Sequence, residues 1–290
     1  MSQARPNAFQ TYHPAVAFAF LACAIALSMM TLHPVFSALS LAGAAACSAV
    51  CRGARETARS FLWAAPLMIV VTLANPLFSA QGSTELLRLG PTAVYAESLA
   101  YGACSGAMLA SVFLWFSSYS SCMNSANSLA LFGNVLPVVS LMVSQVLRLV
   151  PQFVARGRSI AAAQDAVSAA APQTKRQQAA GRLRIVSVLM GWGMEDGIER
   201  SDAMRARGYD CGARRTTYKR YRFRRADGTV LAVVALLAVV SGAFALAATL
   251  SYSFYPKMSA PAAWWVYVPY ALFMAVPVVL QAKEWWLWRR

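Results

Sequence analysis

The 290-residue sequence has little charge and few residues that hold metals or nucleotides. Asp, Glu, Lys and Arg make up 13% of it, against about 25% in an average soluble domain. The six cysteines and two histidines show no paired metal-ligand spacing, and the cysteines suggest no disulfide framework. No GxxxxGK[S/T] motif is present, because the four lysines precede Arg176, Arg220, Met258 and Glu284. These absences argue against a soluble enzyme, a zinc protein and a P-loop nucleotide-binding protein.

Long apolar runs are abundant instead. Hydrophobic residues make up 58% of the chain, and a helix needs about 20 apolar residues to cross a bilayer. Six runs come close to that length or reach it: 14–32, 34–51, 60–78, 98–118, 229–251 and 263–282. They carry almost no ionisable side chains, which argues against a proton or ion relay through the chain. The sequence therefore predicts an all-α integral membrane protein with about six transmembrane helices.

The positive charge is concentrated in one part of the chain. Residues 148–225 hold 17 Lys and Arg against 6 Asp and Glu, which is +11 of the total +15. Basic loops stay in the cytoplasm, so we expect this block and both termini to be cytoplasmic, in a multi-pass protein of the cell membrane that binds lipid and no nucleic acid. The apolar run 131–153 contains Gln145 and Arg148, and a simple crossing there would place the block outside. We expect this run to lie along the cytoplasmic face or within the protein.

The pattern predicts three regions: N-terminal transmembrane helices at 1–118, a cytoplasmic coupling region at 119–228 and C-terminal transmembrane helices at 229–290. Within the coupling region we expect one helix from Pro151 to about residue 171, ended by Pro172. A second helix is expected at about 181–207, ended by Gly208. Four apolar residues should form its packed face: Ile185, Leu189, Trp192 and Ile198. The opposite face should carry an i,i+4 ion pair between Asp196 and Arg200.

The tripeptide Ala206-Arg207-Gly208 falls at the predicted end of this second helix. A small alanine allows close approach, the arginine fork can bind a carboxylate through two nitrogens, and glycine ends the helix so that the arginine projects. The plainer alternative is a solvated helix end whose cation lies near the negative pole of the helix dipole. Ala-Arg-Gly also occurs at 155–157, so the tripeptide alone is not specific.

Three motifs in order give a more specific signal. They are Asn75-Pro76-Leu77-Phe78-Ser79, Leu147-Arg148-Leu149-Val150-Pro151 and Ala203-Met204-Arg205-Ala206-Arg207-Gly208-Tyr209. Together they resemble the transmembrane T component of energy-coupling factor transporters, which are ABC-type importers of vitamins and metal ions. The resemblance implies a non-enzymatic subunit without a cofactor of its own. Its partners would be two ABC ATPase subunits, which bind the ATP, and a membrane-embedded substrate-binding S component.

The resemblance also implies two ATPase-docking signatures, one at the end of each coupling helix. The second matches at Ala206, Arg207 and Gly208, with Met204 beside them. The first falls on four residues near 165: Ala163, Gln164, Asp165 and Ala166. The positions that should hold its arginine and glycine are occupied by Val167 and Ser168, so the first signature is degenerate.

Two other functions stay open on the sequence. An integral membrane enzyme could act on lipid at the cytoplasmic face, holding acidic head groups with the basic block and using Glu195, Asp196 and Glu199 as acid–base groups. No histidine or cysteine accompanies those carboxylates, and no paired DxxxD metal spacing is present. The permease half of an ordinary ABC importer is the third possibility.

Overall fold

The computed structural model describes residues 12–78, 82–89, 92–132, 136–168, 174–209, 211–212, 223–255, 258–260 and 262–288. The chain forms two compact units. One, here called the bundle unit, combines Met1–Leu131 with Tyr221–Arg290. The other, here called the hairpin unit, is Phe132–Arg220.

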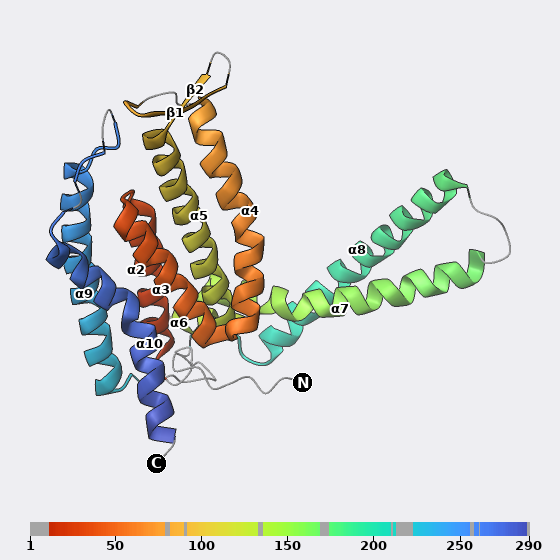
Figure 1. The fold of residues 1–290 in the computed structure, drawn as a ribbon. Helices are drawn as coiled ribbons and strands as arrows, with labels where there is room; N and C mark the ends of the chain where they lie inside the picture. Colours follow the sequence, from red (N-terminus) through yellow and green to blue (C-terminus); the bar gives the residue numbers. More distant parts are fainter. Residues whose placement is uncertain are drawn as a thin grey trace. The chain divides into compact units, whose positions relative to one another are not determined.

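Helices make up most of the bundle unit (Figure 1). They are α2 (Pro14–Met30), α3 (Pro34–Arg52), α4 (Ala54–Phe78), α5 (Ala96–Cys122), α6 (Ser125–Phe132), α9 (Arg225–Ser251), the 3-10 helix η1 (Trp264–Tyr267) and α10 (Val268–Trp288). Two short antiparallel strands, β1 (Glu85–Leu89) and β2 (Thr92–Tyr95), join α4 to α5. This hairpin was not predicted from the sequence, which we divided here only into the apolar runs 60–78 and 98–118.

Six helices among the described residues are long and apolar enough to cross a membrane, which makes the chain a multi-pass membrane protein. Five of them lie where the apolar runs predicted spans: α3, α4, α5, α9 and the segment Trp264–Lys283. The sixth is Pro137–Val167 in the hairpin unit. The first predicted span, 14–32, is the shorter helix α2, which has 17 residues.

Aromatic side chains pack around α2 at the centre of the bundle unit. Phe20 is fully buried, with its ring centroid 5.9 Å from that of Trp115 on α5 and 5.1 Å from that of Phe273 on α10. Rings of this size each bury about 150–250 Å², so they dominate the energy of a core. Although α2 has only 17 residues, contacts from α5 and α10 bury its central side chain and stabilise it.

Two His-Pro pairs begin the first two helices. His13 and His33 are the N-cap residues of α2 and α3, and each ring accepts a hydrogen bond at Nδ1 from the backbone N–H two residues on. The proline that follows each histidine suits the first helical turn, where its missing N–H costs nothing. His33 is fully buried, its Nε2 lies 3.4 Å from the Tyr267 hydroxyl, and its ring centroid is 4.5 Å from that of Tyr252.

The contact between α4 and α5 is backbone against backbone. Gly102 and Gly106 of α5 lie one turn apart, and a Cβ atom built on either would come within 3.0 Å of a carbonyl oxygen of α4. At Gly102 that oxygen belongs to Thr72, whose helical N–H partner is missing because residue 76 is proline. This GxxxG arrangement lets two helices approach closely without a driving force from water. We call it the α4–α5 seam.

Candidate docking site on the long helices of the hairpin unit

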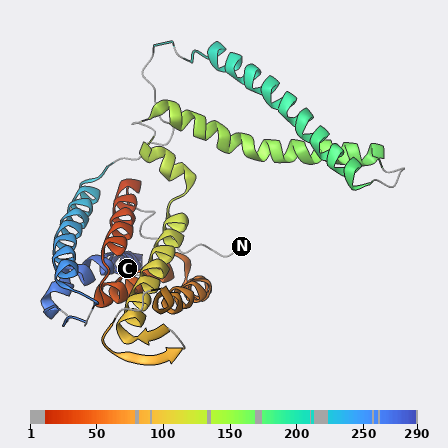
Figure 2. The same cartoon turned by 90° about the horizontal axis from the view of Figure 1, so that it is seen from above.

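The hairpin unit contains two helices of 32 residues each, α7 (Pro137–Ser168) and α8 (Lys175–Ala206). At 1.5 Å per residue each is about 48 Å long. They run antiparallel, as Figure 2 shows from above, and side-chain contacts join them from Gln145–Met204 near one end to Gln164–Gly181 near the other. We predicted that the first of these helices would begin at Pro151, and this is wrong. The apolar residues before Pro151 continue the helix through it, at the cost of one backbone hydrogen bond.

Aromatic and small residues hold the two helices together. The rings of Phe153 on α7 and Trp192 on α8 meet edge to face with centroids 5.2 Å apart. The guanidinium of Arg156 lies 5.4 Å from the centre of the Trp192 ring, in cation–π range. Beside them Gly193 has no side chain, and a Cβ atom there would lie 2.5 Å from the Phe153 ring. This central contact sets how closely α7 and α8 approach.

Polar contacts extend the packing toward the end of α8. Arg200 Nε lies 2.5 Å from Asp196 Oδ2, and the Arg200 guanidinium also donates to Gln152 Oε1 on α7. This confirms the predicted Asp196–Arg200 ion pair, but the predicted faces of α8 are wrong here. Arg200 lies on the packed side, whereas Ile198, predicted to pack, is 65% exposed. A rule that places only apolar residues on the packed face misplaces both side chains. An arginine can also lie on that face when its N–H groups find acceptors on the neighbouring helix.

A Schellman motif ends α8 at the candidate docking residues. Gly208 has φ +84°, the left-handed conformation that favours glycine. The Tyr209 N–H donates to the Met204 carbonyl at 3.0 Å, and the Gly208 N–H donates to the Arg205 carbonyl at 2.9 Å. This pair of hydrogen bonds is the pattern that defines the motif. The prediction that Gly208 ends the helix is confirmed.

The second candidate signature lies on this fixed helix end. Ala206 is the last residue of α8, Arg207 is the C-cap, and both are exposed. The Met204 sulfur accepts a hydrogen bond at 3.3 Å from Gln145 Nε2 on α7. The last turn of α8 is therefore tied to the start of α7, while the side chain at the cap faces outward.

The first candidate signature lies at the other end of the hairpin unit. Ala163, Asp165 and Ala166 are exposed on the last turns of α7. Gln164 is half-buried, and a Cβ atom on Gly181 of α8 would lie 2.5 Å from its Nε2. Val167 is 86% exposed. Pro172 lies outside the described residues.

The two signatures are therefore not brought together. Gly181, which faces Gln164, is 25 residues before Ala206 along α8, a separation of about 38 Å at helical rise. One partner surface that bound both would have to span that length. Two separate partners, one at each end, fit the arrangement without such a requirement.

Sequence reasoning missed a third feature on α8. Five large apolar side chains recur every three or four residues on the exposed surface: Leu183, Val186, Met190, Met194 and Ile198. The spacing was readable, but the same helix also offers the stripe Ile185, Leu189 and Trp192, which is the one that packs on α7. We call the exposed set the outer stripe of α8.

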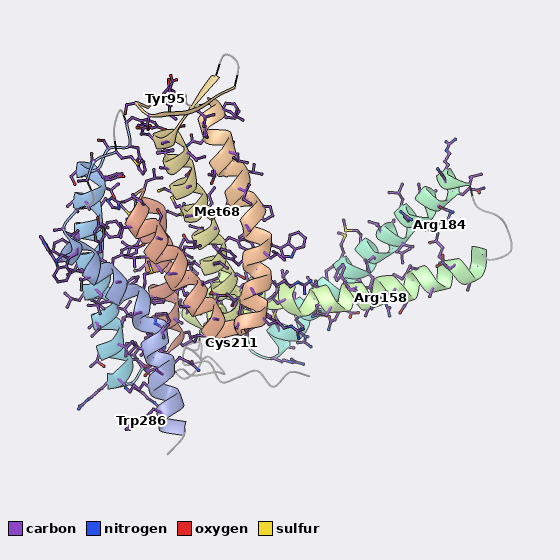
Figure 3. All side chains as sticks on the ribbon, viewed as in Figure 1. Met68, Tyr95, Arg158, Arg184, Cys211 and Trp286 are labelled. Atoms are coloured by element: carbon purple, nitrogen blue, oxygen red, sulfur yellow. The ribbon has the colours of Figure 1, made fainter. Side chains whose placement is uncertain are left out.

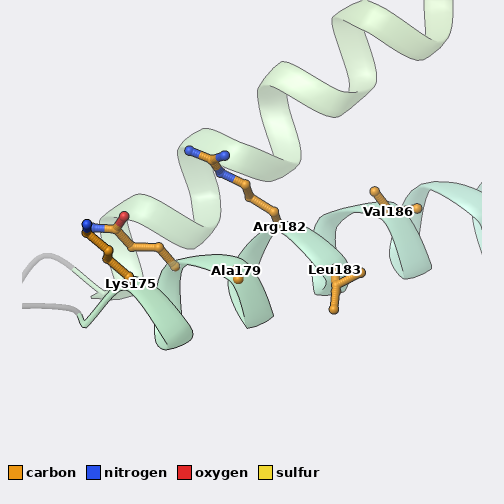
Figure 4. Close-up of a pocket in the computed structure, with 6 residues that line it drawn as sticks. Lys175, Ala179, Arg182, Leu183 and Val186 are labelled. Atoms are coloured by element: carbon orange, nitrogen blue, oxygen red, sulfur yellow. The ribbon is translucent and has the colours of Figure 1, made fainter.

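The first turns of α8 are basic and carry an open hollow, drawn in Figure 4. Its lining comes from α8 alone and includes Lys175, Arg182, Leu183 and Val186. A hollow lined by one helix does not enclose a small molecule. The described residues contain no group of three or more His, Cys, Asp or Glu that could hold a metal ion. Comparisons with models of known protein families and with curated proteins returned no match.

Proposed function

We propose that the chain is the transmembrane energy-coupling subunit of an energy-coupling factor type ABC importer for vitamins or metal ions. Two ATPase subunits would bind the hairpin unit, and a separate S component would bind the transported compound in the membrane. The proposal is supported by the motif resemblance and by one structural observation: an exposed arginine caps a 32-residue helix whose end is fixed by a Schellman motif.

The geometry of that cap suits docking into an acidic groove. Arg207 follows the last helical residue, and Gly208 turns the chain away at φ +84°, so the space beyond the cap is not filled by a continuing helix. The guanidinium can then meet a carboxylate with two parallel hydrogen bonds, which lysine cannot do. The described ion pairs are Arg52–Glu56 and Arg200–Asp196, and neither uses Arg207.

The paired helices would transmit the force. A lone helix bends easily, whereas α7 and α8 are joined at Phe153–Trp192, at Arg200–Gln152 and at Gln145–Met204. A displacement applied at the end of α8 therefore reaches α7 through contacts along the whole unit. The first signature would contribute a weaker ATPase contact based on packing, because Val167 offers no charged group where arginine is expected.

The proposed orientation follows from charge. The block at 148–225 would be cytoplasmic, as would both termini, since it holds +11 of the +15 net charge. In this orientation the segment that begins α7 lies along the cytoplasmic face, although its length and composition would also allow it to cross. The ATPases would then meet the hairpin unit in the compartment that supplies ATP.

Co-purification of Arg207→Ala tests the docking role. An arginine hot spot contributes about 2 kcal/mol or more, which corresponds to about 30-fold weaker binding. We expect the variant to lose one ATPase or both during purification in mild detergent, at unchanged membrane abundance. Arg158→Ala is the matched control, because Arg158 is exposed on α7 at mid-helix (Figure 3). Arg156 is less suitable, since it contacts the Trp192 ring.

Four outcomes would refute the proposal. Retention of both ATPases by Arg207→Ala, or equal losses from Arg207→Ala and Arg158→Ala, would remove the docking role. Purification of the wild-type chain without any ATPase, together with lipid turnover by the isolated chain, would favour the membrane enzyme. A complex with ATPases but no small hydrophobic partner would favour an ordinary ABC permease.

A further inference from the structure

The outer stripe of α8 exposes more apolar surface than a helix in water normally does. Leu183 is 71% exposed, Met190 is 64% exposed and Met194 is 73% exposed. These side chains lie on the face that α7 leaves uncovered, and they follow each other at helical spacing. Contiguous apolar patches on an exposed surface mark an interaction site.

Charge divides α8 into two halves. Its first half, residues 175–190, contains four basic residues and no acidic one: Lys175, Arg176, Arg182 and Arg184. All four are exposed. The second half, residues 191–206, contains four acidic residues against two basic ones. The stripe is therefore bordered by positive charge on the first half and by negative charge on the second.

We propose that the first half of α8 docks on an anionic lipid surface. Leu183, Val186 and Met190 would enter the boundary between head groups and acyl chains, and the basic residues would meet lipid phosphates. An amphipathic helix with Lys and Arg beside an apolar face binds membranes in this way. Figure 4 shows Lys175, Arg182 and Leu183 projecting from this stretch of α8.

Lipid is the occupant that the observations favour. The chain is itself a multi-pass membrane protein, and the hairpin unit that contains α8 is covalently joined to the bundle unit. The basic half complements the negative cytoplasmic leaflet, and the acidic half does not. Docking should therefore stop near Met190 and leave Arg207, at the far end of α8, accessible. This inference does not depend on ATPase binding.

The test uses the full chain in nanodiscs that contain either 30% phosphatidylglycerol in phosphatidylcholine or phosphatidylcholine alone. A nitroxide is attached at Met190→Cys after Cys211, which is exposed, is replaced by Ser. The same protein without the added cysteine gives the background. Glu195→Cys is the matched control, since Glu195 is exposed on α8 outside the outer stripe. Access of oxygen and of a water-soluble nickel chelate to each label is measured by electron paramagnetic resonance.

We expect the label at 190 to be open to oxygen and closed to nickel in anionic nanodiscs, while the label at 195 stays open to nickel. Lys175→Gln and Arg182→Gln should each lower the ratio of docked to free hairpin about fivefold, the loss that corresponds to one basic residue near an anionic surface. High salt should have a similar effect on the unsubstituted helix.

Three results would overturn the inference. A label at 190 that is open to nickel in both lipids would place the stripe in water. A label closed to both reagents would show that protein covers it. If the label is open to oxygen and its accessibility is the same with and without anionic lipid and in both Gln variants, the stripe is buried in apolar lipid without recognition of head groups.

Discussion

Filling the α4–α5 seam should destabilise the bundle unit in proportion to the size of the added side chain. A Cβ atom at Gly106 would lie 2.9 Å from the Met68 carbonyl oxygen and 3.2 Å from Thr72 Oγ1. A relaxed contact between carbon and carbonyl oxygen is about 3.3–3.6 Å, so α4 must move by roughly half an ångström. The nearest atom is backbone and cannot rotate away.

The magnitude follows from two opposing terms. Overpacking of this kind costs about 1–3 kcal/mol, whereas replacing glycine by alanine within a helix gains up to about 1 kcal/mol. Gly106→Ala should therefore lose about 1 kcal/mol of unfolding free energy, and Gly106→Leu more than about 3 kcal/mol, since its side chain has no space. A loss of 3 kcal/mol lowers the melting temperature by about 6–12 °C.

A second substitution at Gly102 tests the geometry further. Its Cβ atom would lie 2.8 Å from the Thr72 carbonyl oxygen, about 6 Å along α5 from Gly106. Because either substitution alone moves α4 away, the double variant Gly102→Ala/Gly106→Ala should lose less than the sum of the single losses.

Thiol labelling on heating provides the assay. Cys104 lies on α5 and is 7% exposed. It is two residues from each glycine and therefore on the opposite side of α5 from the seam, so a thiol-reactive dye reaches it only when the bundle unit unfolds. Gly197→Ala on α8 is the control, because nothing lies within 4 Å of its Cβ position; it should not lower the melting temperature. If Gly106→Leu melts at the wild-type temperature, α4 and α5 do not meet through this seam.

Two further predictions concern a helix end and a buried histidine. Gly208→Ala forces alanine into φ +84°, which should lower the unfolding free energy of the helix end by about 1 kcal/mol. Hydrogen exchange at the Tyr209 amide should then become faster, whereas Gly191→Ala should leave that exchange rate unchanged. Burial lowers the pKa of His33 from its ordinary value of 6.5, so the unfolded chain takes up the proton first and stability should fall as pH drops below about 6.5. His33→Asn keeps a side-chain acceptor for the N-cap without titrating, and its melting temperature should depend less on pH between 7 and 5; an unchanged dependence would assign the effect to another group.

The long apolar runs were sufficient to predict most of the helices, because a helix that spans a bilayer needs about 20 apolar residues in a row. The run at 98–118 became Ala96–Cys122 and the run at 60–78 became Ala54–Phe78. The errors arose where packing overrides local preference. We expected Pro151 to begin a helix, because its missing N–H costs nothing in a first turn, but in α7 it sits within a continuous helix of 32 residues. A proline favours a helix boundary locally, so the local sequence does not show that the helix continues through it.

The candidate site was predictable only in part. The helix end at Gly208 was predictable, since a left-handed cap favours glycine and the periodic pattern stops there. The packed face of α8 was predicted only in part: Ile185, Leu189 and Trp192 are half-buried as expected, whereas Ile198 belongs to a second apolar stripe and is exposed. The hydrogen-bond partner of Arg200 on α7 could not be predicted from the sequence. Gln152 is 48 positions away and becomes a neighbour only through the antiparallel pairing.

The α4–α5 seam also bears on how the bundle can move. Interlocked side chains resist both separation and sliding, but at Gly102 and Gly106 there are no side chains to interlock. Close approach keeps the two backbones together, and two hydrogen bonds cross the contact: Thr72 Oγ1 donates to the Gly102 carbonyl and Asn75 Nδ2 donates to the Ser98 carbonyl, each at 3.4 Å. These hydrogen bonds hold α4 and α5 in one register, because a shift along the helix axis separates each donor from its acceptor. Movement of α4 along α5 must therefore break these two hydrogen bonds, but it need not open the core around Phe20, whose ring packs on Trp115 of α5 and Phe273 of α10.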